Sequence, residues 1–136
     1  MKSFNSIRLS MLLLSVMILG ACSHDVPFAT RIVSMEYPRL AALARITGTV
    51  ALRVGIDSTG KVVTAKGLSG HPILIKGAEA NMMLWRFAPG HAASEFDFTY
   101  IFKLTGDSYE TRQCSTLIYE YPDKVTIASE APHWMP

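Results

Sequence analysis

Two stretches of the chain alternate between apolar and polar residues with a period of two, the pattern of a β-strand with one buried face. They cover residues 49–56 and 95–104. Residues 61–68, rich in β-branched side chains, follow the first stretch after a turn sequence that ends in Gly60, so this pair predicts a β-hairpin. The apolar positions of the alternating strands are Val50, Leu52, Val54 and Ile56, then Phe96, Phe98, Tyr100, Phe102 and Leu104.

Two other segments carry apolar residues at helical spacing. The first begins at Tyr37-Pro38 and continues to Arg45, and the second runs from about Ile73 to Leu84. Pro suits the first turn of a helix, and Ser69 or His71 could cap the second one. On the second helix, Leu74, Ala78, Met82 and Trp85 form the apolar face, and Lys76, Glu79 and Asn81 are expected to point elsewhere.

The order helix, strand, strand, helix, strand predicts an α+β fold. We expect a small antiparallel three-stranded sheet packed on two helices, with the other face of the sheet in solvent. Residues 116–121 and 125–128 could form additional C-terminal strands. Residues 130–136 contain two prolines and are expected to fray.

The first 21 residues have the pattern of a cleavable leader. Lys2 and Arg8 are basic, and the apolar run 11–21 that follows is shorter than the roughly 20 residues of a spanning helix. The sequence Leu19-Gly20-Ala21-Cys22 resembles the bacterial lipobox, in which the Cys sulfur receives a diacylglycerol. The alternative is an ordinary signal peptide cleaved nearby, with Cys22 incidental.

A lipobox divides the chain into a signal peptide (1–21), a tether (22–33) that reaches about 40 Å at most, a folded domain (34–105) and a C-terminal extension (106–136). Lipidation at Cys22 would anchor the protein to a membrane without spanning it. Ser23 follows the Cys in place of the Asp that often retains lipoproteins at the inner membrane, which favours the periplasmic side of the outer membrane.

Composition narrows the classes of function. Without Lys2 and Arg8 of the leader, 11 basic residues balance 11 acidic ones, so composition predicts no electrostatic footprint for nucleic acid and no polybasic patch for lipid. The hydrophobic fraction of 49% can supply a core.

Candidate chemistry is sparse, and we expect no enzyme, metal or cofactor. If Cys22 carries lipid, Cys114 has no partner within the chain, which leaves a buried thiol or an intermolecular bridge. His71, His91 and His133 lack zinc-ligand spacing with Cys114. Asp57 fits turn chemistry better than a general base, and no phosphate loop is present.

Several short motifs together resemble the C-terminal domain of TonB energy transducers. They are Tyr37-Pro38, Gly48-Thr49-Val50, Asp57-Ser58-Thr59-Gly60-Lys61-Val62, Ser69-Gly70-His71-Pro72 and Trp85-Arg86-Phe87-Ala88-Pro89. The resemblance covers about residues 34–105. We expect Trp85 and Phe87 to pack in the core rather than to touch a ligand.

The resemblance implies a function and a site. Such domains bind a periplasmic peptide segment of an outer-membrane transporter by adding it as a strand to their sheet, and so serve TonB-dependent transport. The family's receiving edge corresponds to residues 95–104, and the segment before Tyr37 also contacts transporters. The resemblance thus implies partner-binding residues Ser34, Met35, Glu36, Phe96, Asp97, Phe98, Thr99, Tyr100, Ile101 and Lys103.

The sequence also departs from the family pattern. The family often has Gln-Pro where this chain has Ser34-Met35, and a full TonB has an uncleaved membrane helix and a Pro-rich rod that are not evident here. A structural lipoprotein or homodimer is therefore the alternative, in which residues after Gly106 cover the edge of the third strand. The position of that extension decides between the two interpretations.

Overall fold

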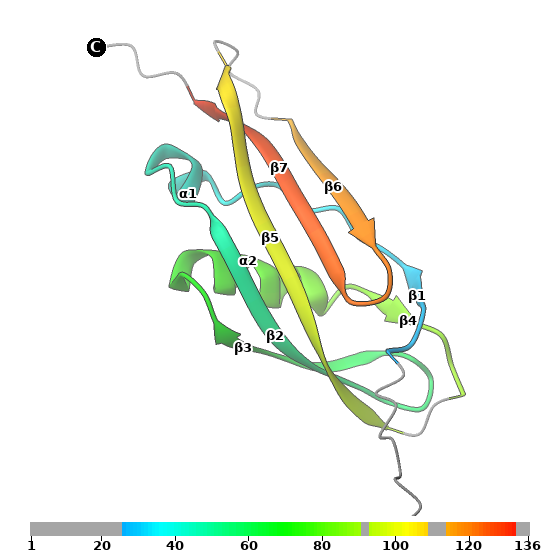
Figure 1. The fold of residues 1–136 in the computed structure, drawn as a ribbon. Helices are drawn as coiled ribbons and strands as arrows, with labels where there is room; N and C mark the ends of the chain where they lie inside the picture. The colour runs from blue at the N-terminus through cyan, green and yellow to red at the C-terminus, as the bar shows by residue number, and fades with distance from the viewer. Residues whose placement is uncertain (1–25, 91–92, 109–113, 133–136) are drawn as a thin grey trace, which may run out of the picture.

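The computed structural model describes residues 26–90, 93–108 and 114–132. Its main sheet has five strands in the order β3-β2-β5-β7-β6, and β1 and β4 form a second, two-stranded sheet (Figure 1). The elements are β1 (Ala29–Arg31), α1 (Arg39–Leu43), β2 (Gly48–Ile56), β3 (Val62–Ser69), α2 (Pro72–Met82), β4 (Arg86–Phe87), β5 (Ser94–Ser108), β6 (Ser115–Glu120) and β7 (Lys124–Pro132).

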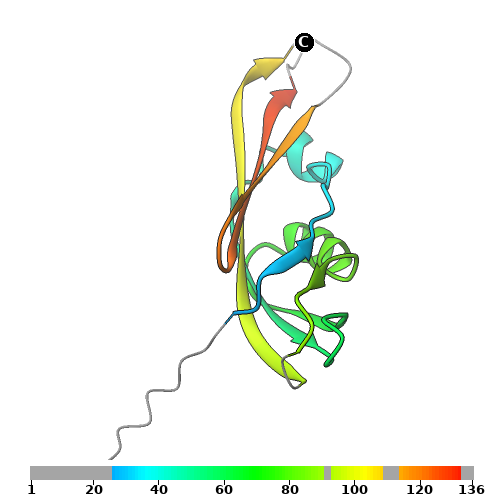
Figure 2. The ribbon, with the colours of Figure 1, turned by 90° about the vertical axis from the view of Figure 1, so that its right-hand side faces the viewer.

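Both helices lie on one side of the main sheet, and no described helix or strand covers its other face (Figure 2). This confirms the expected α+β class and the single covered face. The predicted antiparallel trio is present as β3, β2 and β5, but the sheet is larger and mixed, because β7 runs parallel to β5. None of the helices in the described residues is long and apolar enough to cross a membrane.

Strand β5 lies at the centre of the sheet, and its strong alternation gives it one buried face and one uncovered face. Phe96, Phe98, Tyr100 and Phe102 are between 0% and 4% exposed and face the helices. Trp85 packs edge-on against Phe98 with ring centres 5.5 Å apart. The prediction that Trp85 enters the core is therefore confirmed, and Phe87 is buried as well.

Helix α2 follows the predicted pattern with one exception. His71 caps it, since its Nδ1 accepts a hydrogen bond from the N–H of Ile73 at 3.3 Å, and the four residues of the expected apolar face are fully buried. Asn81 was expected to point away from the core, but it is 5% exposed. Helix α1 is shorter than predicted and ends before Arg45, whose φ of 52° is left-handed.

The hairpin between β2 and β3 has the predicted turn. Asp57 accepts hydrogen bonds from the N–H groups of Thr59 and Lys61 and from the Thr59 hydroxyl, which lower the pKa of its carboxyl. Gly60 has a φ of 83°, and a Cβ there would overlap the carbonyl of Phe87. The hydrogen bond from the Phe87 N–H to the Gly60 carbonyl holds the two segments this close together. Only glycine fits there, because it has no Cβ.

Both ends of the described chain join the fold, which changes two predicted boundaries. Residues 29–31 were placed in the tether, but they form β1, and Ala29 is 4% exposed. Residues 130–132 were expected to fray, but they complete β7 beside the end of β5. The expected C-terminal strands are confirmed as β6 and β7, which extend the sheet that the N-terminal part begins.

Candidate functional site

The third predicted strand is a central strand over most of its length. On one side, β5 pairs with β2 from Ser94 to Phe102, and on the other it pairs with β7 from Thr99 onward. The family resemblance implied that residues 95–104 form a free receiving edge, unless the residues after Gly106 cover it. That expectation is wrong for residues 99–104, because Val125 and Ile127 of β7 are buried against the same core and hold β7 in place.

The beginning of β5 has a different environment. β7 pairs with β5 only from Thr99, whose N–H donates to the carbonyl of Asp123 at 2.8 Å, and no described strand pairs with residues 94–98 on that side. Successive residues of a strand direct their backbone groups to opposite sides. The backbone groups of Glu95 and Asp97 therefore point to the same side as those of Thr99. We call residues 94–98 the open half of β5.

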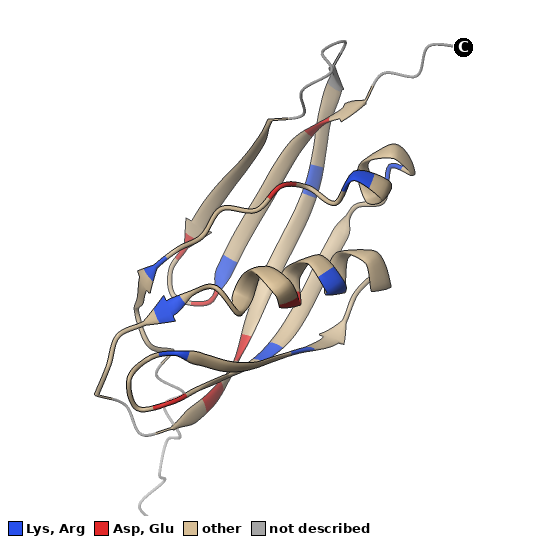
Figure 3. Ribbon diagram, turned by 180° about the vertical axis from the view of Figure 1, so that it is seen from behind, with Lys and Arg blue, Asp and Glu red and all other residues tan. Residues whose placement is uncertain are grey.

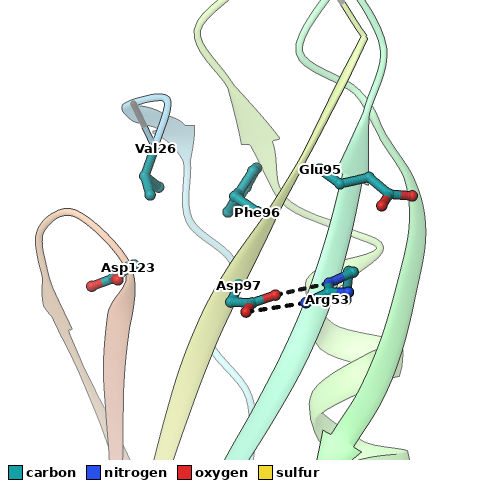
Figure 4. A pocket seen from close by; sticks show the side chains of 6 residues that line it. All are labelled: Val26, Arg53, Glu95, Phe96, Asp97 and Asp123. Atoms are coloured by element: carbon teal, nitrogen blue, oxygen red, sulfur yellow. Dashed lines mark hydrogen bonds and ion pairs between the residues drawn. The ribbon is translucent and has the colours of Figure 1, made fainter. Parts of the chain in front are cut away.

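A cavity of about 490 Å³ lies beside the open half (Figure 4). Phe96 and Asp97 of β5 lie between Val26 of the N-terminal segment and Arg53 of β2, and Asp123 comes from the turn between β6 and β7. The cavity thus brings together four segments that are distant in sequence. Its lining residues are Val26, Arg53, Glu95, Phe96, Asp97 and Asp123.

The cavity is rich in charge, and one ion pair organises it. Arg53 donates to the two carboxylate oxygens of Asp97 at 2.9 and 3.3 Å, and both side chains are about half exposed. The hydrogen bond and the charge of Asp97 raise the pKa of Arg53. Such an exposed pair orients its partners more than it stabilises the fold.

The side chains of β5 divide into two groups. Of the residues implied in partner binding, Phe96, Phe98 and Tyr100 are core side chains that point towards the helices. A partner beside the open half would therefore meet the backbone groups of Glu95 and Asp97 more than the buried side chains of Phe96 and Phe98. The others lie on the uncovered face, where Asp97 and Lys103 are exposed and Thr99 and Ile101 are half-buried.

The other implied segment, residues 34–36, lies elsewhere. Ser34 and Glu36 are exposed, and Met35 packs against the core. The next residue, Tyr37, donates its N–H to the hydroxyl of Ser115 at 2.8 Å. Ser115 is the first residue of β6 and pairs with Ser129 of β7, which in turn pairs with Leu104 of β5. Leu104 is six residues beyond Phe98, about 20 Å along the strand. The structure does not bring residues 34–36 to the open half.

Asn81 holds the segment before Tyr37 in place. Its Nδ2 donates to the carbonyls of Val33 and Ser34 at 2.9 and 3.4 Å. Its Oδ1 accepts from Trp85 Nε1 and from the Tyr100 hydroxyl, both at 2.9 Å. The amide thus satisfies polar groups of three separate segments. Burial raises the pKa of the Tyr100 phenol. Its position four residues before Trp85 was a signal that the sequence offered.

Catalytic and metal chemistry finds no support in the part of the chain that the structure describes. No group of three His, Cys, Asp or Glu residues there could hold a metal ion. Cys114 is exposed as a free thiol, so the predicted buried thiol is wrong. The expectations for His91 and His133, and for Cys22 and the leader, fall outside the described residues.

Comparison with protein families gives one match, to the family described as Gram-negative bacterial TonB protein C-terminal, over residues 33–104. The matched segment runs from the residue before Ser34 to Leu104 in β5. It therefore ends before β6 and β7 begin. A comparison with curated proteins found no match.

Proposed function

Because the chain belongs to the TonB C-terminal family over more than half of its length, we propose that it binds a transporter segment by strand addition at the open half of β5. Domains of this family are periplasmic in Gram-negative bacteria and interact with TonB-dependent transporters. The observation that carries the proposal is the start of β7 opposite Thr99. It leaves residues 94–98 without a described partner strand on that side, next to the cavity.

The length of the open half limits the interaction. Five residues of a strand span about 17 Å, so the incoming segment would form only a few main-chain hydrogen bonds. It would lie in line with β7 and end at the turn that contains Asp123. A short pairing of this kind gives modest affinity, which suits a reversible contact.

The first experiment is a titration of the isotopically labelled chain from Ser23 onward with TonB-box peptides of transporters from the same cell. We expect saturable amide shifts in residues 94–98 and small shifts from Thr99 onward. The variant Glu95→Pro should abolish binding, because proline removes the N–H that points to the added strand. The matched variant Glu95→Ala keeps that N–H and should bind almost normally.

An engineered disulfide between β5 and β7 tests whether β7 must move. Lys103 and Ala128 are directly opposite each other in β5 and β7, so Lys103→Cys with Ala128→Cys, in a Cys114→Ser background, can lock the two strands together. We expect the locked and the reduced protein to bind peptide equally. Binding only after reduction would show that the peptide replaces β7, and would overturn the proposed position.

The cover that β7 provides also favours the alternative, a structural lipoprotein that self-associates. Among the described strands β6 has one unpaired side, and Ile118 on it is 50% exposed. In that case no peptide would shift any β5 amide, and sedimentation would show a dimer that Ile118→Lys disrupts. A monomer with peptide shifts in residues 94–98 excludes this alternative.

We also propose that Cys22 carries a lipid that holds the domain on the periplasmic side of the outer membrane. The lipobox-like sequence and Ser23 support this proposal. The domain begins closer to the anchor than the sequence alone predicts. Val26 already lines the cavity and lies four positions after Cys22, so the chain between them spans about 14 Å at most.

A further inference from the structure

The small β1–β4 sheet brings three cations into one cross-strand row. Arg31 of β1 is directly opposite Arg86 of β4, and Arg86 forms an isolated bridge with Lys61 at the start of the hairpin's second strand. We call these three residues the basic row. Figure 3 shows basic positions on β1 and β4 next to each other at one side of the molecule.

Within the described residues, the row keeps most of its positive charge. Side chains directly opposite in neighbouring strands have Cβ atoms about 5 Å apart, and like charges there repel each other. The ion pairs in residues 26–90, 93–108 and 114–132 involve none of the three. The carboxylate of Asp57 attracts Lys61 and offsets part of its charge, whereas the ion pairs among the described residues leave Arg31 and Arg86 without a carboxylate partner.

Backbone pairing holds the three residues next to each other, and their charged groups reach solvent. Arg31 and Lys61 are exposed, and Arg86 is half-buried, with one guanidinium nitrogen donating to the carbonyl of Trp85 at 2.9 Å. That bond orients the guanidinium of Arg86. Guanidinium and ammonium groups in a row match the oxygens of phosphate groups.

The location of the row favours a membrane surface as its partner. Arg31 lies nine residues after Cys22, about 30 Å at most, so a lipid on Cys22 would keep the row close to the bilayer. Phe28, three residues before Arg31, is 58% exposed and contacts Tyr121, which is 63% exposed, with ring centres 6.1 Å apart. Exposed aromatic side chains are typical of surfaces at the membrane interface.

We infer that the basic row binds the phosphate headgroups of anionic phospholipids and so turns the β1 side of the domain towards the membrane. Three cations are fewer than a polybasic segment contains, so the row would orient the domain rather than hold it there. Orientation matters for the proposed function because Val26, five residues before Arg31, lines the cavity beside the open half. The anchoring at Cys22 is itself proposed, so the test uses a protein without lipid.

The test measures partition of the chain from Ser23 onward, which includes all described elements, between buffer and vesicles. The vesicles contain phosphatidylcholine alone or mixed with phosphatidylglycerol. We expect binding only to the anionic vesicles and a loss of binding at high salt. Arg31→Gln with Lys61→Gln should lower the partition coefficient about 25-fold, since each cation near an anionic surface contributes about fivefold.

A matched pair controls for net charge. Arg39→Gln with Lys76→Gln removes the same charge from α1 and α2, both exposed positions, and should change partition less than about threefold. Thermal unfolding checks that both variants fold. An equal loss in both pairs, or equal binding to neutral vesicles, would overturn the inference.

An acidic peptide gives the remaining outcome. If the protein binds polyglutamate through the basic row but does not bind anionic vesicles, the partner of the row is an acidic protein segment. That result would overturn the inferred binding to lipid headgroups. Failure of this inference leaves the peptide titration at residues 94–98 unaffected, since that experiment contains no membrane. The two proposals can therefore fail separately.

Discussion

At the scale of single residues, Asn81 has more influence on the fold than its class predicts. An exposed asparagine on a helix contributes little, but this one is buried and joins α2 to Trp85, to β5 and to the segment before Tyr37. Among the described residues that are not exposed, no buried side-chain nitrogen or oxygen lacks a hydrogen-bond partner. Removing one member of such a network leaves the others unsatisfied.

We predict that Asn81→Ala lowers the free energy of unfolding by about 3 kcal/mol, because it leaves buried groups of Trp85 and Tyr100 without a partner. Urea denaturation measures the change. Lys76→Ala, an exposed position on the same helix, should cost less than about 0.5 kcal/mol. A loss below 1 kcal/mol for Asn81→Ala, on the same order as an ordinary surface change, would contradict the network's importance.

Tyr37 is expected to make the free energy of unfolding depend on pH in the alkaline range. Burial raises the pKa of its phenol to about 12, and its hydroxyl donates to the carbonyl of Ile46 at 2.6 Å. The folded protein therefore keeps the proton at pH values where the unfolded chain releases it. This contribution is complete below pH 10, the ordinary pKa, and is lost between about pH 10 and 12.

We predict that the free energy of unfolding falls as the pH rises through that range, and that Tyr37→Phe makes the fall less steep. At neutral pH the variant should lose about 1 kcal/mol, the net value of one hydrogen bond. Denaturation at a series of alkaline pH values measures both effects. A slope that is identical in the variant would assign the fall to other groups, such as Tyr100.

At the scale of elements, β7 decides which part of β5 is available. It pairs with β5 in parallel, and its inner residues Val125 and Ile127 are fully buried. β6 precedes β7 in the chain but lies outside it in the sheet, so β7 fills the space between β5 and β6. The sequence predicted the two strands, but their order in space follows from which strand can bury its apolar face against the helices.

We predict that Ile127→Ala lowers the free energy of unfolding by about 3 kcal/mol, since it leaves a cavity between β7 and the core. Ile118→Ala, on the half-exposed β6 position, should cost about 0.5 kcal/mol or less. Equal effects of the two substitutions in urea denaturation would show that β7 is not part of the core. In that case the whole of residues 95–104 would be available for strand addition by a partner.

At the scale of the whole molecule, the cavity and the basic row both include residues near the beginning of the described chain. Val26 lines the cavity, and β1 carries the first cation of the row five residues later. A lipid at Cys22 would therefore place the proposed peptide site beside the membrane. This differs from the tether of 12 residues that the sequence suggested, because β1 takes part in the fold.

We predict that the exported protein, purified from membranes, carries a diacylglycerol on Cys22 and lacks residues 1–21. Mass spectrometry of the N-terminal peptide would detect the added lipid. Cys22→Ser should leave the domain folded but no longer recovered with membranes. An unmodified Cys22, or cleavage at another bond, would favour the ordinary signal peptide instead.

The sequence by itself determined the parts of this protein that depend on local pattern. The period of two in residues 49–56 and 95–104, the apolar face of α2, a helix cap at Ser69 or His71 and the Asp57–Gly60 turn all depend on a few neighbouring residues. The structure confirms them, with His71 as the cap. The burial of Asn81 was not predicted, because it depends on Trp85, Tyr100 and the segment before Tyr37 together.

Only the tertiary structure decided what lies beside what. The position of β7, the open half of β5 and the pairing of Arg31 with Arg86 and Lys61 join segments that are tens of residues apart. A balanced composition predicted no basic patch, yet strand register gathered three cations. Such contacts depend on burial summed over the whole core and on chain connectivity, which no short stretch of sequence contains.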